Sequence, residues 1–169
     1  MSIGDINSDA RGSGARFNTG KAPLELLPLY TLAGYLHSLS GHDQPASRPV
    51  LALYALGRFQ AGGGANDLLD AMHLCAGYDW SECAHVFDYG RKKYAEWNWA
   101  KGMAWSVPLA CAARHLLAIE RGEEIDAESG RQHWGHAACN IVMLLVYQRT
   151  FPAGDDRPKC LDGLVPDVR

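Results

Sequence analysis

The stretch that decides the fold is SVPLACAARHLLAIERGEEIDAESGRQHWGHAACNIVMLLVY, residues 106–147. Its first part predicts a helix over 106–120, because Ser106 suits an N-cap, Pro108 is tolerated in a first turn, and mostly apolar residues follow. Its last part, 131–147, is the longest apolar helix candidate and is ended by Pro152. The polar connection 121–130 separates the two parts, so we expect an antiparallel helix hairpin.

Further segments before the hairpin also repeat apolar residues at helical spacing. These segments cover about 23–39, 49–59, 68–75 and 83–94. Asn66 or Asp67 can cap the third, and Asp79 with Glu82 has the spacing of a capping box that opens the fourth. Gly90, inside the fourth segment, marks either a weak point or a close contact. No run alternates apolar and polar residues over the length of a strand, and we therefore predict an all-α fold.

The chain has 169 residues, which is about one domain's worth. Residues 1–20 are rich in Gly, Ser, Asn and Asp and predict a polar N-terminal arm that could be ordered only by docking on something. We expect the helical domain over 21–152 and a C-terminal tail over 153–169.

The composition is that of a soluble globular protein, with 47% hydrophobic and 21% charged residues. The net charge of −3 offers no basic field for a nucleic-acid polymer, whereas a free nucleotide stays possible as a ligand. The five cysteines form no C-x-x-C pair and predict buried thiols in a reducing compartment. The N-terminus does not read as a signal peptide and the longest apolar run, 141–147, is too short to span a bilayer, so we expect a cytoplasmic protein and no membrane partner.

Polar side chains interrupt both apolar helices of the predicted hairpin. Arg114 and His115 lie in the middle of the first, where a buried guanidinium would need a carboxylate or a bound anion. In the second, His133, His136 and Asn140 share one face at the spacing i, i+3, i+7. The polar groups of such a row need hydrogen-bond partners when they are buried. The partners are either groups of the facing helix, as for ordinary core histidines, or a metal and a substrate.

The connection between these helices carries four carboxylates in six residues, namely Glu123, Glu124, Asp126 and Glu128. On its own the segment is typical of a solvated loop in which Asp126 or Glu128 caps the following helix. Because His133 lies only one turn away, the clustered oxygens also suit Mg²⁺ or Mn²⁺, which act on phosphates.

Basic and aromatic residues precede the hairpin. The run 91–93 is Arg-Lys-Lys, and Asn98, Trp99 and Lys101 follow it. These residues are either a solvated basic face with core tryptophans, or a phosphate clamp with an aromatic ring and an amide available for a base.

Two familiar motifs carry little weight in this sequence. Thr19-Gly20-Lys21 ends like a P-loop, but Ala15 and Ala22 stand where the first Gly and the final Ser or Thr should be. His42-Asp43 is the dipeptide of the HD phosphohydrolases, yet it lies between Gly41 and Pro45 in a predicted turn and not on a helix.

Several blocks of the sequence, in order, resemble the phage dATP/dGTP diphosphohydrolases, MazG-like (MazZ-type) members of the all-α nucleotide pyrophosphohydrolases. The blocks fall within 14–140 and are 14–21, 26–28, 89–94, 98–102, 113–117, 122–130 and the residues His133, His136 and Asn140. MazG proteins place E-E-x-x-E on one helix and E-x-x-D on the next. Here the corresponding hairpin has histidines on its helices and gathers its carboxylates at the tip.

The resemblance implies a MazG-like helical bundle that hydrolyses a purine deoxynucleoside triphosphate to the monophosphate and pyrophosphate. The favoured substrate is dGTP, with dATP as the other candidate, because relatives make dGMP for phage synthesis of a modified purine. Such a protein would work in the cytoplasm of the host. Two or more Mg²⁺ or Mn²⁺ ions would bridge the phosphates.

The same resemblance assigns roles to the residues quoted above. Glu123, Asp126 and Glu128, with Glu124 in reserve, would bind the metal. His115, His133, His136 and Asn140 would serve catalysis by binding metal, positioning water or accepting a proton. Lys21, Lys93 and Arg114 would hold phosphates, and Asn98 and Trp99 would contact the base or sugar.

Two other functions stay open at this point. An HD-type triphosphohydrolase would release nucleoside and tripolyphosphate, and a non-catalytic helical nucleotide-binding or assembly protein would use the polar hairpin only to fix helix register. The resemblance also implies assembly, because helical members of this superfamily commonly form dimers or tetramers, and we expect a homotetramer or a homodimer.

Overall fold

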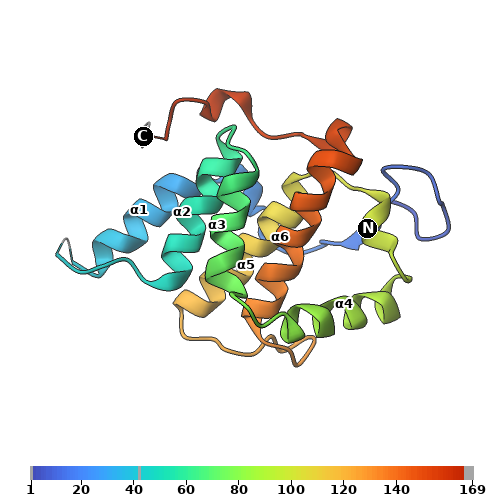
Figure 1. The fold of residues 1–169 in the computed structure, drawn as a ribbon, viewed down its shortest axis with the longest axis horizontal. Coiled ribbons are helices and arrows are strands. Elements are labelled where there is room, and N and C mark those ends of the chain that lie inside the picture. The colour runs from blue at the N-terminus through green and yellow to red at the C-terminus, as the bar shows by residue number, and fades with distance from the viewer. Residues whose placement is uncertain (1, 42, 166–169) are drawn as a thin grey trace.

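The computed structural model describes residues 2–41 and 43–165, and these are mainly helical (Figure 1). The helices are α1 (Leu29–Leu39), α2 (Arg48–Gln60), α3 (Ala65–Cys75), α4 (Ser81–Lys93), α5 (Ser106–Glu120) and α6 (His133–Thr150). Short 3-10 turns cover Leu24–Leu26, Asn98–Lys101, Pro152–Gly154 and Lys159–Leu161. The strands β1 (Ser2–Ile3) and β2 (Arg16–Phe17) have two residues each and pair antiparallel. The predicted all-α class is confirmed.

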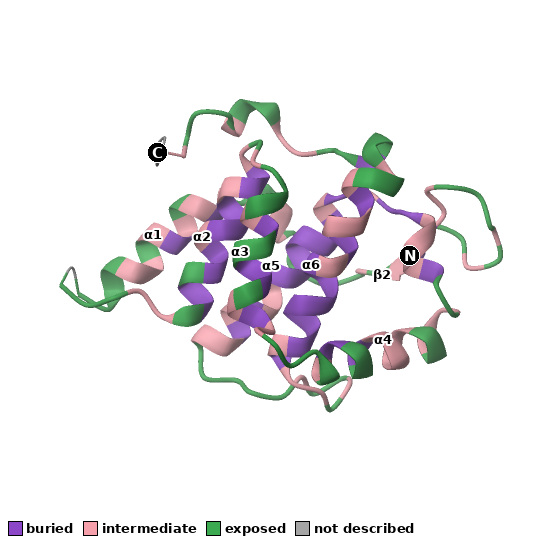
Figure 2. Cartoon of the chain, in the orientation of Figure 1, coloured by how far each residue is buried: buried purple, intermediate pink, exposed green. Residues whose placement is uncertain are grey.

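The α5–α6 hairpin is the centre of the fold. His115, late in α5, contacts His133 at the start of α6, while the Tyr147 hydroxyl near the other end of α6 donates to the Trp99 carbonyl before α5, at 2.6 Å. The two helices therefore run antiparallel, as predicted. Figure 2 shows their buried surface in the middle of the molecule, with α1, α2 and α3 on one side and α4 on the other. The largest fully buried side chains that they contribute are Leu109, Leu116, Ile141, Leu144 and Tyr147.

Several helices begin differently from the sequence prediction, because distant side chains accept hydrogen bonds from the groups at their starts. The N-cap of α5 is Trp105, and the N–H and hydroxyl of Ser106 instead donate to the Asp156 carboxylate. The N-cap of α6 is Gln132, whose N–H donates to the Glu82 carboxylate of α4 at 3.2 Å. Asp126 and Glu128 therefore do not cap α6.

Other local predictions are also corrected. The capping box at α4 is wrong, because Glu82 pairs with Arg131 while Asp79 accepts hydrogen bonds from the N–H and hydroxyl of Ser81. The N-cap of α3 is Gly64, two or three residues before the positions expected. The predicted run 23–39 is a 3-10 turn followed by α1, with the break at Pro28.

The N-terminal arm is ordered by docking on the segment that precedes α5. Backbone N–H groups of Gly12 and Gly14 donate to the carbonyls of Lys101 and Gly102, at 2.7 and 2.9 Å. The Lys101 ammonium donates back to two arm carbonyls, and the Asn98 side chain holds both polar groups of Ala15. Gly102 is required here, since its φ is +95° and a Cβ would lie 2.6 Å from the Phe151 ring.

The remaining sequence expectations concern thiols and membranes. Four cysteines (Cys75, Cys83, Cys111 and Cys139) are buried, Cys160 is exposed, and all five are free, so the expectation of small buried thiols is confirmed for the first four. Within the ranges that the structure describes, no helix combines the length and apolarity needed to cross a bilayer.

Candidate functional site

Three histidines converge where α5 ends and α6 begins. The Nδ1 atoms of His115 and His133 lie 2.8 Å apart, so one ring donates a hydrogen bond to the other. The rings of His115 and His136 stack with centroids 4.4 Å apart and planes inclined by 16°. The i, i+3 spacing places His133 and His136 on one face of α6, and the antiparallel hairpin brings His115 against that face.

Asp126 joins this cluster from the connection between the helices. Its Oδ2 accepts hydrogen bonds from the N–H and the hydroxyl of Ser129, at 2.9 and 2.8 Å. The Ser129 hydroxyl also lies 2.6 Å from Nε2 of His136. The Asp126 N–H also donates to the Arg131 carbonyl, which closes this part of the connection. The Asp126 carboxylate is thereby directed back toward the hairpin.

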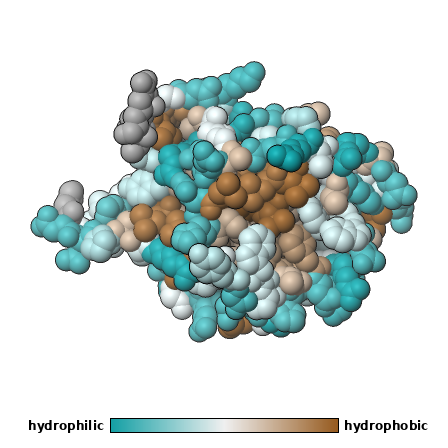
Figure 3. All heavy atoms as spheres, viewed as in Figure 1, coloured by the Kyte–Doolittle hydropathy of each residue, from teal (hydrophilic) through white to brown (hydrophobic). Residues whose placement is uncertain are grey.

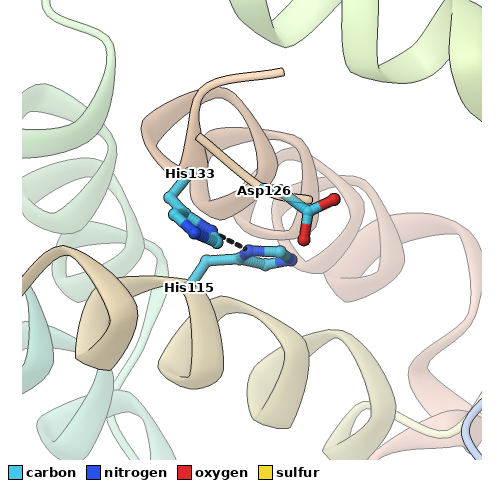
Figure 4. Close-up of side chains that lie close together, drawn as sticks. All are labelled: His115, Asp126 and His133. Carbon is cyan, nitrogen blue, oxygen red and sulfur yellow. Dashed lines mark hydrogen bonds between the residues drawn. The ribbon is translucent and has the colours of Figure 1, made fainter. Parts of the chain in front are cut away.

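His115, His133 and Asp126 form a group that could hold a metal ion. One donor atom of each residue lies within 4.8 Å of the other two. Figure 4 shows the His115 ring between its partners, with one edge bonded to His133 and the other pointing toward the Asp126 carboxylate.

The charge of this cluster follows from burial. Burial lowers the pKa of His115 to about 2, helped by the neighbouring His136 and His133. Burial also lowers the pKa of His136 to about 4, although the Asp126 charge opposes it. For Asp126 itself, burial raises the pKa, but the Ser129 hydrogen bonds outweigh burial and keep it below the ordinary value. At neutral pH the cluster therefore contains neutral His115 and His136 rings and an ionised carboxylate.

One donor of the cluster has no partner. Nε2 of His133 is buried and makes no hydrogen bond with the described residues, its nearest acid being Oε2 of Glu123 at 3.9 Å. A buried polar atom without a partner costs free energy. Two imidazoles and a carboxylate are also a donor set that divalent transition metals prefer. The residues present therefore fit a divalent ion.

The other carboxylates expected at a metal lie outside this group of three. Glu128 is held by Lys93, by the Tyr89 hydroxyl at 3.3 Å and by Lys21 at 3.7 Å. Glu123 accepts from Arg121 at 2.9 Å, and Glu124 is exposed. Adjacent residues of a folded connection point in different directions, so the spacing that groups them in sequence does not group them in space.

The cluster lies in the wall of a cavity of about 900 Å³. The cavity extends along α4 and the segment 94–99, where Trp80, Trp97 and Trp99 contribute aromatic surface. Predicted phosphate and base residues line it too: Lys21, Lys93, Asn98, Trp99 and Arg114. Asn140 is buried away from it and donates its amide to the His136 carbonyl at 2.8 Å, while its Oδ1 has no hydrogen-bond partner among the described residues.

Asn98 and Arg114, like the two lysines, are already engaged. Both ends of the Asn98 amide bond to the backbone of Ala15, which leaves neither end free. Arg114 was expected to face a carboxylate or an anion, but it donates to the Ala22 carbonyl and to Oδ1 of Asn18, at 3.1 and 3.2 Å. Because Arg114 is only part-buried, neutral oxygens suffice as partners.

Sequence reasoning assigned no role to three residues of the site. Ser129 and Tyr89 contact predicted site residues, and Arg16 lines the cavity from the arm. All three lie within blocks of the resemblance, but a lone serine, tyrosine or arginine carries no spacing signal that would assign it a role. Of the HD dipeptide, His42 lies outside the described residues and Asp43 is exposed.

Comparison with known proteins places the hairpin in a family. The family model described as dATP/dGTP diphosphohydrolase, N-terminal, matches residues 60–157, which include the three histidines and Asp126. A dATP/dGTP diphosphohydrolase of Salmonella phage PMBT28 is 33% identical over 88 residues, or 52% of this chain and 29% of that protein. The match thus spans under a third of the relative's length, and no solved structure matches the chain. By the extent of the family match, the chain belongs to the dATP/dGTP diphosphohydrolase N-terminal family.

Proposed function

We propose that this chain hydrolyses dATP or dGTP to the deoxynucleoside monophosphate and pyrophosphate at the tip of the α5–α6 hairpin. The observation that carries the proposal is the convergence of His115, His133 and Asp126 in the wall of the cavity. Its volume of about 900 Å³ lies within the range of roughly 300–1,000 Å³ typical of small-molecule sites. The name of the phage relative, dATP/dGTP diphosphohydrolase, supports the same substrates.

His115, His133 and Asp126 would hold a divalent ion, with His136 beside them. Such an ion supplies charge stabilisation to phosphate oxygens when it is bound. The two nitrogen donors favour Mn²⁺ over Mg²⁺, which prefers oxygen ligands. We propose one ion held by these residues; the second ion that the resemblance implies would take its ligands largely from the substrate phosphates.

In the proposed reaction a water oxygen attacks the α-phosphorus. The bond from that phosphorus to the oxygen bridging to the β-phosphate breaks, and pyrophosphate leaves. The proton of the water passes toward the hydrogen-bonded chain of His136, Ser129 and Asp126. Asn140 acts as a positioning residue by bonding to the His136 carbonyl.

The remaining site residues would bind the rest of the substrate. Lys21, Lys93 and Arg114 lie on the cavity wall, where phosphates would replace their present partners in part. The Trp99 ring, 6.0 Å from the Trp97 ring, offers a surface on which a purine can stack. Asn98 contributes by holding the arm in place. Within this scheme dGTP is the favoured substrate, and the dGMP formed would feed modified-purine synthesis.

The test is to incubate the protein with dGTP or dATP and Mn²⁺ and to resolve the products. We expect monophosphate and pyrophosphate, with activity lost on adding EDTA and restored better by Mn²⁺ than by Mg²⁺. Nucleoside with tripolyphosphate would show the HD-type reaction instead, and no turnover of either nucleotide would favour a binding or assembly protein.

The metal ligands can be tested separately from turnover. Asp126→Asn should weaken Mn²⁺ binding, measured by calorimetry without nucleotide, by about tenfold or more, because a carboxylate ligand becomes a neutral amide. Asp70→Asn is the matched control, since Asp70 is an exposed residue of α3 outside the cavity. Equal Mn²⁺ affinity of wild type and Asp126→Asn would contradict the assignment.

A further inference from the structure

Arg16 is an arginine whose charge no described residue neutralises. It lies in β2, on the cavity wall, and its Nη1 is 3.6 Å from the Met143 sulfur of α6. That sulfur is a weak, uncharged acceptor. Among the described residues no carboxylate forms an ion pair with Arg16 and no oxygen accepts from its guanidinium.

The other basic residues of the cavity differ from Arg16 in this respect. Lys21 and Lys93 pair with Glu128, Arg91 with Asp88, and Arg121 with Glu123. Arg114 bonds to the oxygens of Asn18 and Ala22. Of the described basic side chains that line the cavity, Arg16 is thus the one without an oxygen partner.

Within the part of the chain that the structure describes, the groups that act electrostatically on Arg16 include no carboxylate either. Its electrostatic neighbours include Cys139 and Tyr147. Burial raises the pKa of the Cys139 thiol and of the Tyr147 phenol above their ordinary values, so both groups are neutral at pH 7. The positive charge of Arg16 also acts on His115 and His136, where it adds to the lowering of their pKa by burial.

The backbone on both sides of Arg16 is fixed. Asn98 holds Ala15 through two hydrogen bonds of 3.1 and 2.9 Å, and Arg16 itself pairs with Ile3 in the two-stranded sheet. The N–H of Phe17 donates to the Tyr94 hydroxyl, and the two rings stack with centroids 5.5 Å apart. The backbone that carries the Arg16 side chain is therefore fixed before any ligand arrives, which lowers the entropy cost of binding.

Arg16 is half-buried, and a partly desolvated charge without a charged partner is unfavourable for folding, so that replacing it by an apolar group is often neutral or stabilising. A planar guanidinium is at the same time well suited to bind two phosphate oxygens. From this position and this lack of partners, we infer that Arg16 is the principal phosphate-binding residue of the cavity and takes an oxyanion of a triphosphate. The triphosphate of the nucleotide in the proposed function is the occupant, so the inference rests on that function.

The test measures binding of sodium tripolyphosphate by calorimetry in EDTA, so that no metal contributes. Arg16→Met, which keeps the length of the side chain and removes its charge, should bind tripolyphosphate at least about tenfold more weakly than wild type. Its ligand-free melting temperature should equal or exceed that of wild type. Arg11→Met is the matched control, because Arg11 belongs to the same arm but bonds to the Ala100 carbonyl outside the cavity. It should bind like wild type.

Comparing tripolyphosphate, dGTP and deoxyguanosine shows which part of a nucleotide Arg16 binds. Arg16→Met should weaken binding of tripolyphosphate and dGTP alike and leave binding of deoxyguanosine, which has no phosphate, unchanged. If Arg16→Met does not fold, Arg16→Gln repeats the comparison with a polar side chain. Wild-type affinity of either folded variant for tripolyphosphate would overturn the inference, as would failure of wild type to bind it.

These outcomes are distinct from failure of the proposed function. If wild type binds tripolyphosphate through Arg16 but hydrolyses neither dATP nor dGTP, the phosphate site stands and the proposed function fails. If wild type hydrolyses dGTP and Arg16→Met binds tripolyphosphate as wild type does, the proposed function stands and the inference fails.

Discussion

Asn98 shows how far a single residue's role depends on its surroundings. Its position beside Trp99 in a block resembling nucleotide hydrolases predicts a contact with base or sugar. In the structure it is buried, and its amide bonds to both polar groups of Ala15. An asparagine amide mimics a backbone amide and can therefore pair with an extended segment as a neighbouring strand would.

Asn98→Ala should lower the free energy of unfolding by about 2–4 kcal/mol, because two buried backbone groups of Ala15 lose their partners. Urea unfolding measures the loss. Asn66→Ala, at an exposed position in the first turn of α3, should change stability by less than about 0.5 kcal/mol. Equal effects of the two substitutions would show that Asn98 does not anchor the arm.

Glu82 gives a prediction about pH at the same scale. Its carboxylate accepts from Arg131 and from the Gln132 N–H at the start of α6, and the hydrogen bond from Arg131 is the largest cause that holds its pKa below 4.5. A carboxyl with a lowered folded-state pKa stabilises the protein above its unfolded-state pKa, and that stability is lost as the pH falls through the folded-state pKa.

The stability difference between wild type and Glu82→Gln should therefore be largest near pH 7 and shrink below about pH 4.5. Urea unfolding at a series of pH values between 7 and 3 gives this difference directly. A difference that stays constant or grows toward acid pH would contradict the role of the Glu82 charge.

At the scale of elements, the crossing of α4 over α6 depends on glycine. A Cβ at Gly135 in α6 would lie 2.9 Å from the backbone of Glu82 in α4, closer than packed atoms approach. A Cβ at Gly90 in α4 would meet nothing within 4 Å. The sequence predicts that Gly90 is either a weak point of the helix or a site of close contact. The structure supports the weak point for Gly90, whereas the close contact is at Gly135.

These two glycines form a matched pair of substitutions. Gly135→Ala should destabilise the protein by about 1–3 kcal/mol, because α4 must move away from α6. Gly90→Ala should stabilise it by about 0.4–1 kcal/mol, because alanine reduces the entropy of the unfolded chain at no steric cost. Thermal or urea unfolding of both variants measures the two signs. Stabilisation by Gly135→Ala would mean that the helices do not cross this closely.

The helix boundaries show a second lesson at this scale. Positions and periods of the helices follow from the apolar pattern, but the caps of α4, α5 and α6 were predicted from nearby residues and are wrong. At a helix start, nearby hydroxyls and carboxylates compete with distant side chains for the backbone N–H groups. At the starts of α5 and α6 the acceptors are the distant carboxylates of Asp156 and Glu82.

At the scale of the whole molecule, assembly stays a prediction. Large apolar side chains remain exposed on the outer helices, among them Tyr35, Leu39 and Leu69. Figure 3 shows apolar side chains gathered near the middle of one face. We expect a homotetramer in preference to a homodimer, and light scattering coupled to size-exclusion chromatography gives the mass. A monomer at micromolar concentration would contradict this expectation.

The sequence by itself determined the all-α class, the antiparallel hairpin and the face that carries His133 and His136, because these depend on the spacing of residues along one helix. Only the tertiary structure decided that Asp126 is the tip carboxylate grouped with His115 and His133, and that Arg16 lies beside Met143, 127 positions away. Such contacts join segments that no local period relates. Their free energy comes from burial and hydrogen bonds that exist only once the arm, α4 and the hairpin have packed together.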